Sequence, residues 1–239
     1  MAEKMTRAEH PLPAVLLHWV HLLSFFLLMG TGLYIHSPLE GFSTMAVMDE
    51  IHFVTMYVFI LTTIVRVYWA FFGAGSSALG SVKRVRDYRH FALTRLDTKT
   101  FGSTLAYYLF LRKTRPYSPK YNPLQKVTYG YLFPLIILFM ALTGFSMFLP
   151  TAGAMTWFVA WFGGQNGVRL AHYFAMWVLF VFFMIHFYLV VFEDLKELPN
   201  MLLRYVPKKD RVIGDYPADQ VPANTRGSHA AAKTGDSST

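Results

Sequence analysis

The sequence of 239 residues contains no cysteine. This absence excludes disulfides, iron–sulfur clusters, thiolate metal sites and covalent haem attachment within the chain. Charged residues are also scarce, because they make up 15% of the chain, against about a quarter of an average soluble domain. Hydrophobic residues reach 54% and aromatic residues 17%. The composition therefore indicates a membrane protein rather than a soluble globular domain.

The apolar residues are gathered into long runs. A helix needs about 20 mostly apolar residues to cross a bilayer, and four stretches reach that length: residues 13–35, 48–72, 124–149 and 168–192. The first stretch lacks a small-residue cleavage site, so we expect a retained helix and not a signal peptide. Residues 107–111 are apolar but too short, and we assign them to a surface helix near residues 98–112.

The net charge of +8 is distributed unevenly along the chain. Lys and Arg occur before the first apolar stretch, between the second and third, and after the fourth, whereas loops 37–46 and 150–167 contain none. Lys and Arg near span ends mark the cytoplasmic side of a membrane. Both termini and the long central loop are therefore predicted to be cytoplasmic. The basic residues indicate topology, so no nucleic-acid partner is expected.

These observations predict an all-α integral membrane protein, a bundle of four transmembrane helices with both termini cytoplasmic. Residues 1–205 would form the membrane domain. Beyond them the chain becomes polar, and we predict that residues 206–239 are a disordered cytoplasmic tail.

Histidines recur inside the predicted spans, where ionisable residues are costly and are functional candidates. His172 and His186 are fourteen residues apart. At 100° and 1.5 Å per residue, this interval returns to nearly the same helix face about 21 Å further along. One histidine would lie near the outer surface and the other near the inner surface. The remaining helices carry the same interval in the pairs His18 and Gly32, His52 and Arg66, and Gly130 and Gly144.

The interval pairs the histidines by depth. At the outer level His52 would face His172, and Gly32 and Gly144 would leave room beside them. At the inner level the corresponding set is His18, His186, Gly130 and, as a cation for an anionic group, Arg66. Two facing imidazoles can bind a haem iron, glycines leave room for the macrocycle, and a cation can pair with its propionates. The pattern therefore predicts two haem b groups, each bound by two histidines in the bundle core.

Other interpretations of these residues stay open. A single intramembrane histidine often bonds a carbonyl of a neighbouring helix, and small residues also serve plain helix packing. A metal bound directly by side chains fits poorly, because the two pairs are some 20 Å apart by helix geometry. His21 is an alternative inner ligand, although we expect it to donate to a carbonyl or a propionate. His36 and His90 are predicted to be solvated loop residues, and the aromatic run 157–162 an interfacial belt or a docking surface.

Several short motifs occur together with these histidines. They are HW at 18–19, GTG at 30–32, IHF at 51–53, RVYWAFFG at 66–73, NPL at 122–124, TGF at 143–145, AHYFAMW at 171–177 and IHFYLVVFED at 185–194. In this combination the chain resembles, over about residues 12–205, the b-type cytochrome subunits that anchor respiratory nickel–iron hydrogenases. These are related to the gamma subunit of membrane-bound formate dehydrogenase.

The resemblance implies a function and a set of partners. Haem b would be bound by His18, His52, His172 and His186. The chain would lie in the cell inner (plasma) membrane as a multi-pass protein, surrounded by lipid. It would pass electrons from a periplasmic hydrogenase, with its small iron–sulfur and large nickel–iron subunits, to menaquinone or ubiquinone. As part of a hydrogen:quinone oxidoreductase it would hold no complete active site of its own.

Quinone is expected near the inner surface. The loop entering the third helix offers the side chains of Asn122, Gln125 and Lys126, and the resemblance to the formate dehydrogenase gamma subunit places such an asparagine and the inner haem-ligand histidine, His186, at the quinone. Glu193 is a candidate for proton supply. Because a proline follows Asn122, this residue is also a candidate N-cap of the third helix.

Two alternative functions remain at this stage. The sequence KYNPLQK at 120–126 is closer to the formate dehydrogenase form of the loop. A gamma-type cytochrome b subunit of a formate dehydrogenase or of a sulfur-compound reductase is therefore the first alternative. A haem-free membrane transporter or scaffold is the alternative of another class.

Overall fold

The computed structural model describes residues 2–6, 11–76, 84–116, 118, 121–149, 153–192, 195, 198–203 and 212–217. The chain forms two compact units, which we describe separately. The first unit comprises Met1–Val15, Val67–Tyr131 and Lys196–Thr239, and the second comprises Leu16–Arg66 and Leu132–Leu195.

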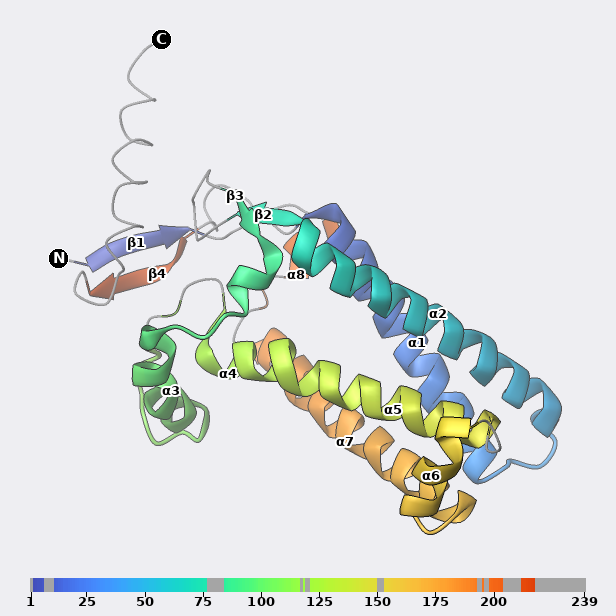
Figure 1. Cartoon of the computed structure of the whole chain (residues 1–239). Coiled ribbons are helices and arrows are strands. Elements are labelled where there is room, and N and C mark those ends of the chain that lie inside the picture. The colour runs from blue at the N-terminus through green and yellow to red at the C-terminus, as the bar shows by residue number, and fades with distance from the viewer. Residues whose placement is uncertain are drawn as a thin grey trace. The chain divides into compact units, whose positions relative to one another are not determined.

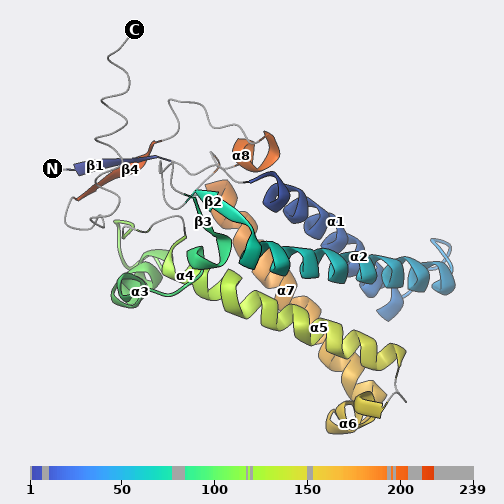
Figure 2. The ribbon, with the colours of Figure 1, turned by 45° about the horizontal axis from the view of Figure 1, so that its top comes forward.

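Long apolar helices make up the second unit. They are α1 (Leu12–His36), α2 (Met45–Phe72), α5 (Phe133–Phe148) and α7 (Gln165–Phe192), and they lie side by side in Figures 1 and 2. Among the described residues, four helical segments are long and apolar enough to cross a membrane. The third, Pro123–Phe148, consists of α4 (Pro123–Val127), the π-helical segment η2 (Thr128–Leu132) and α5. The four predicted spans agree with these bounds to within three residues. The prediction of an all-α membrane bundle is confirmed.

The helices of this unit contact one another in a ring. Thr31 on α1 bonds His52 on α2. Aromatic pairs lie between the other neighbouring helices, where bulky rings fill the space. These pairs are Phe53 with Phe148 between α2 and α5, Phe133 with Phe182 between α5 and α7, and Phe26 with Phe183 between α7 and α1.

The outward faces of these helices are apolar. Leu23 is 64% exposed, Leu61 60%, Leu135 63% and Phe174 69%. Apolar side chains exposed along whole helices are expected where lipid replaces water. The unit therefore has the surface of a membrane bundle.

A short helix, α6 (Gly153–Trp161), lies within the predicted outer loop 150–167. Its nine residues are too few to cross a bilayer, so the lengths of the apolar runs did not predict this helix. Phe158 is buried and its ring packs on that of Phe162, which in turn contacts Phe139 on α5. Trp157 and Trp161 remain exposed, as expected of an interfacial belt.

The first unit contains short elements and one amphipathic helix. That helix, α3 (Arg95–Tyr108), begins at an N-cap on Thr94, three residues earlier than predicted, and packs against α4 (Pro123–Val127). Strands β2 (Ala74–Ser76) and β3 (Arg84–Arg86) pair in antiparallel fashion, and the 3-10 helix η1 (Asp87–His90) follows them. A last short helix, α8, spans Leu198–Leu203.

A second antiparallel pair joins β1 (Ala2–Thr6) to β4 (Val212–Pro217), with Ala2 opposite Pro217. Strand β4 lies in the range 206–239 that the sequence predicted to be disordered, so those six residues differ from the prediction. The strands AEKMT and VIGDYP do not alternate apolar and polar residues, so no local pattern predicted this pairing between segments about two hundred residues apart. The other residues of the predicted tail lie outside the described part, and the boundary near residue 205 stays a prediction.

His90 also differs from its prediction. It was expected to be a solvated loop residue, but it ends η1 and is only 7% exposed. Its ring meets the edge of Tyr121, which stacks on Phe91. This packing accounts for the burial.

Candidate functional site

Two threonines hold the histidines of the predicted outer level. On α1, the hydroxyl of Thr31 donates to the carbonyl of Leu27 at 2.6 Å, and its oxygen lies 2.8 Å from Nδ1 of His52 on α2. On α5, the hydroxyl of Thr143 donates to the carbonyl of Phe139 at 2.8 Å, and its oxygen lies 2.8 Å from Nδ1 of His172 on α7. The same arrangement thus occurs twice, on two different helix pairs.

Each of these threonines is followed by a glycine that lies beside the same imidazole. A Cβ atom at Gly32 would lie 3.5 Å from Cε1 of His52, and one at Gly144 would lie 3.6 Å from Cε1 of His172. Cε1 joins the two ring nitrogens, so both glycines keep the space next to the imidazole nitrogens free of side chain. The structure thus places Gly32 beside His52 and Gly144 beside His172, two of the contacts that the sequence assigned to this level.

Methionines from the other helices approach the same place. The Sδ atom of Met176 on α7 would lie 3.9 Å from a Cβ at Gly32, and that of Met56 on α2 would lie 3.9 Å from one at Gly144. All four helices therefore contribute to this level of the bundle. Sulfur side chains are flexible and polarisable, and they suit the lining of a site for a large planar group.

The inner pair is formed by His18 on α1 and His186 on α7. Their ring centroids are 6.3 Å apart, with an angle of 63° between the ring planes. A metal–imidazole bond is about 2.0–2.1 Å, so two rings on opposite sides of one metal atom have centroids about 6 Å apart, when ~1.1 Å from each nitrogen to its ring centre is added. The separation thus fits one iron atom between the rings. Trp19 meets the edge of His18 at 5.7 Å.

His21 has hydrogen-bond partners at both ring nitrogens. Nδ1 lies 2.7 Å from the carbonyl of Leu17, and Nε2 lies 3.0 Å from the hydroxyl of Thr63. The carbonyl bond is the contact that we expected from the sequence. With both nitrogens engaged, His21 is poorly placed to serve as the alternative ligand.

Arg66 is half-buried on α2. It belongs to the inner end of the predicted span, because the helix ends six residues later at Phe72. Its proposed pairing with a propionate stays a prediction.

Gly130 has a different neighbour from the one expected. A Cβ at this position would lie 3.0 Å from Cβ of Phe91, in the same unit, so close packing against that ring already requires a small residue. Gly130 also lies in the π-helical segment η2 (Thr128–Leu132). The rotation of 100° per residue does not hold across a π-helical segment. The fourteen-residue interval alone therefore does not imply that Gly130 and Gly144 share a face, and the assignment of Gly130 to the inner level stays a prediction.

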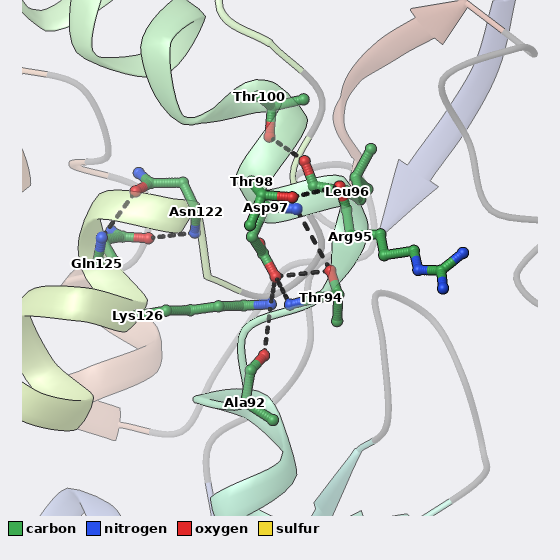
Figure 3. A network of polar contacts seen from close by, with 10 residues as sticks. All are labelled: Ala92, Thr94, Arg95, Leu96, Asp97, Thr98, Thr100, Asn122, Gln125 and Lys126. Atoms are coloured by element: carbon green, nitrogen blue, oxygen red, sulfur yellow. Dashed lines mark hydrogen bonds and ion pairs between the residues drawn. The ribbon is translucent and has the colours of Figure 1, made fainter.

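The predicted quinone residues at the start of α4 are held by local contacts (Figure 3). The Oδ1 atom of Asn122 accepts the backbone N–H of Gln125 at 2.8 Å, and the Gln125 side chain accepts the backbone N–H of Asn122 at 3.0 Å. This reciprocal capping box, with Pro123 at the first helical position, starts the helix. Asn122 is thus the N-cap, and its Nδ2 also donates to Tyr108 Oη at 2.9 Å.

Lys126 forms a buried ion pair one turn further along α4. Its Nζ atom lies 2.8 Å from Oδ2 of Asp97 on α3 and 3.3 Å from the carbonyl of Ala92, with side-chain exposures of 4% for Lys126 and 2% for Asp97 (Figure 3). Burial alone would raise the pKa of Asp97. Hydrogen bonds from Lys126 and Thr94, together with the lysine charge, outweigh burial and lower that pKa below its ordinary value. Lys126 therefore joins α4 to α3. Glu193, the fifth predicted residue, lies outside the described residues.

Thr31 and Thr143 are the residues that sequence reasoning missed. Both stand in motifs that were noticed, GTG and TGF, but only the glycines were interpreted. The repeated Thr-Gly dipeptide at the outer end of two spans was the available signal.

The fold and these contacts define a class of protein. It is a multi-pass membrane bundle in which the rings of His18 and His186 approach each other and in which His52 and His172 each bond a threonine of a neighbouring helix. In the part of the chain that the structure describes, no three His, Cys, Asp or Glu side chains converge as a direct metal site requires. Axial ligation of a planar cofactor by two histidines agrees with this donor set.

The chain belongs to the prokaryotic cytochrome b561 family, whose pattern matches residues 9–204. A protein described as a probable Ni/Fe-hydrogenase B-type cytochrome subunit of Rhizobium leguminosarum bv. viciae is 30% identical, over 84% of this chain and 87% of that protein. A protein of the same description from Azotobacter vinelandii is 31% identical, over 80% and 82%. A probable Ni/Fe-hydrogenase 1 B-type cytochrome subunit of Escherichia coli K12 is 28% identical, over 77% and 81%. The chain is therefore a b-type cytochrome of the bacterial inner membrane, and its cofactor is haem b.

Proposed function

We propose that this chain is the membrane-embedded electron-transfer subunit of a respiratory nickel–iron hydrogenase. The observation that supports the proposal is the approach of His18 on α1 to His186 on α7, with 6.3 Å between their ring centroids. The descriptions of the relatives from Rhizobium and Azotobacter, which match at least 80% of this chain, support the choice of hydrogenase.

We further propose that the chain binds two haem b groups. His52 and His172 would bind the outer one, and His18 and His186 the inner one. Haem b supplies reversible one-electron transfer at its iron. The protein would supply the histidine nitrogens that bind the iron, the glycines beside the outer histidines and a lipid-covered bundle that keeps water away. Arg66 would supply a positive charge for a propionate of the inner group.

The proposed partners follow from what the chain cannot do alone. Without cysteine it holds neither nickel nor an iron–sulfur cluster in the usual thiolate sites. The large nickel–iron subunit would oxidise hydrogen, and the small iron–sulfur subunit would deliver electrons to the outer pair. The outer ends of α1, α2, α5 and α7 are joined by loops without Lys or Arg, which supports a periplasmic placement of that side and cytoplasmic termini.

Menaquinone or ubiquinone is the proposed acceptor on the cytoplasmic side. We retain His186, Asn122, Gln125 and Glu193 as candidates for that site, on the basis of the resemblance to the formate dehydrogenase gamma subunit. Lys126 is the weakest candidate of the original set, because Asp97 and the Ala92 carbonyl already engage its ammonium group.

A spectroscopic experiment on intact membranes tests the proposal. The chain is expressed with its hydrogenase subunits, and a reduced-minus-oxidised spectrum is recorded after hydrogen is added. We expect a haem b α-band, about two haems per chain by pyridine haemochrome assay, and hydrogen-dependent reduction of added quinone. Absence of the α-band would remove haem b, whereas an α-band that formate but not hydrogen produces would assign the chain to a formate dehydrogenase.

A further inference from the structure

The outer histidines share a hydrogen-bond arrangement that fixes the position of one proton. The hydroxyl hydrogen of Thr31 lies between the carbonyls of Leu27 at 2.6 Å and Leu28 at 3.2 Å. That of Thr143 lies between the carbonyls of Phe139 at 2.8 Å and Met140 at 3.1 Å. A hydroxyl has a single hydrogen to donate, so each threonine oxygen is left to accept.

The imidazoles must then be the donors. Each Nδ1 lies 2.8 Å from a threonine oxygen that has already given its hydrogen to a carbonyl. A hydrogen bond at that distance requires a proton on Nδ1 of His52 and of His172. In a neutral imidazole the other nitrogen, Nε2, then carries the lone pair.

We propose that Thr31 and Thr143 are positioning residues that select the Nδ1–H tautomer of the outer histidines, so that Nε2 binds the iron of the outer haem. This inference rests on the proposed function, since it takes His52 and His172 as ligands. The threonines contact the imidazoles and act through them.

The arrangement also adjusts the ligand electronically. A metal-bound histidine whose second nitrogen donates a hydrogen bond is a stronger base, and its ring orientation is fixed. A stronger base favours ferric over ferrous iron, which lowers the midpoint potential of that haem. Thr143 is fully buried, so no water molecule could take the place of its hydroxyl after substitution. The Nδ1–H group of His172 would then lose its hydrogen-bond acceptor.

The burial of both threonines fits this role. Thr143 is 0% and Thr31 6% exposed, and each lies one position before the glycine that borders the same imidazole. One helical dipeptide thereby supplies the acceptor for Nδ1 and the open space at Cε1. The same contacts occur between α1 and α2 and between α5 and α7. Both proposed outer ligands therefore have a threonine acceptor at Nδ1 and a glycine beside Cε1.

The experiment compares isosteric and conservative variants in the full hydrogenase complex. Thr31→Val and Thr143→Val remove the hydroxyl and keep the shape, and Thr31→Ser and Thr143→Ser keep the hydroxyl. Thr63→Val is the matched control, because Thr63 makes the same kind of carbonyl bond and contacts His21 instead of a proposed ligand. Midpoint potentials come from optical redox titration, and haem retention comes from transfer to an excess of a haem-binding acceptor protein.

We expect each valine variant to raise the midpoint potential of the outer haem and leave that of the inner haem unchanged. Haem retention at the outer site should fall about 10–100-fold, as for other outer-shell partners of metal ligands. The serine variants should restore both values, and Thr63→Val should match the wild type. An unchanged outer potential in both valine variants, with two haems bound, would overturn the inference and leave the proposed function standing. A wild-type chain without haem b would instead overturn the proposed function itself.

Discussion

The outer and inner histidine pairs of the bundle are held in different ways. His52 and His172 are each tied at Nδ1 to a threonine whose own hydrogen goes to a helix carbonyl. His18, in contrast, is set by rings, with His186 at 6.3 Å and Trp19 at 5.7 Å. The difference teaches that the orientation of the outer imidazoles is built into the helices that surround them.

The largest expected effect comes from removing one histidine at each level. His172→Ala and His186→Ala should each lower the haem content from about two to about one per chain, because every haem b depends on both axial ligands. Hydrogen should no longer reduce the remaining haem in His172→Ala, whereas it should still do so in His186→Ala. Pyridine haemochrome assays and hydrogen-reduced spectra give both values. If hydrogen failed to reduce the remaining haem in both variants, the proposed order of reduction, outer haem before inner haem, would be wrong.

The second prediction separates haem reduction from quinone reduction on the inner side. In Asn122→Leu combined with Glu193→Gln, hydrogen should still reduce the haems, while quinone reduction should fall at least tenfold, about 1.4 kcal/mol of barrier lowering. Asn122→Leu also removes the N-cap of α4, at a cost of about 1 kcal/mol. Asn122→Asp is therefore the control, since it keeps the cap acceptor and loses the amide. Unaffected quinone reduction in the double variant would place the quinone elsewhere.

Glycine substitutions distinguish the two levels by their effect on haem. Gly144→Val should lower outer haem content, because its side chain would extend beside Cε1 of His172. Gly130→Ala should leave both haems bound but lower stability by about 1–3 kcal/mol through crowding against Phe91. Haem content and thermal unfolding measured on the same preparations check both outcomes. If Gly130→Ala instead loses the inner haem, the original assignment of Gly130 to that haem is correct.

Arg66→Leu should change the inner haem by a smaller amount. Removing a cation near a propionate makes the oxidised haem, with its extra positive charge, easier to form, so the inner midpoint potential should decrease. The outer potential should stay unchanged, and Arg66→Lys should preserve most of the wild-type value. Redox titration of both α-band components is the measurement. An inner potential equal to that of the wild type would leave Arg66 with a role at the membrane surface only.

The smallest effect is expected away from the histidines, at the α3–α4 contact. Asp97 has a lowered pKa, so its ion pair contributes stability that is present above the ordinary value of 3.8 and lost as the pH falls below it. Asp97→Asn should weaken the pH dependence of thermal unfolding in that acidic range while both haems stay bound. Asp49→Asn, at an exposed aspartate on α2, is the control. An unchanged pH profile in Asp97→Asn would mean that other carboxylates dominate acid unfolding.

The sequence predicted the parts of this molecule that depend on local pattern. The lengths of the apolar runs gave the spans, and the positions of His52 and His172 beside Gly32 and Gly144 followed from helical periodicity. Thr31 and Thr143 were missed because a hydrogen bond between helices depends on how the helices rotate against each other. That rotation is set by packing, so the repeated Thr-Gly dipeptide could mark the two threonines but not their bonds to His52 and His172.

The remaining differences have related causes. Helical periodicity does not fix the face on which Gly130 lies, because one π-helical segment changes the rotation per residue. His90 was misassigned because its polar side chain suggested a solvated loop, whereas contacts with Tyr121 bury it. The capping box at Asn122 was predictable, since an asparagine followed by proline is a local signal. The buried partner of Lys126 was not, because Asp97 lies 29 residues away.

That separation of 29 residues between Asp97 and Lys126 has a consequence for how the chain is made. Translation delivers the N-terminal part first, so Asp97 and its cap, Thr94, emerge before the third span is synthesised. Contacts between residues this close in sequence close quickly. The nascent chain can therefore neutralise the ammonium group of Lys126 while α7 is still unmade. The span that starts at Pro123 would then reach the insertion machinery with its buried charge already matched.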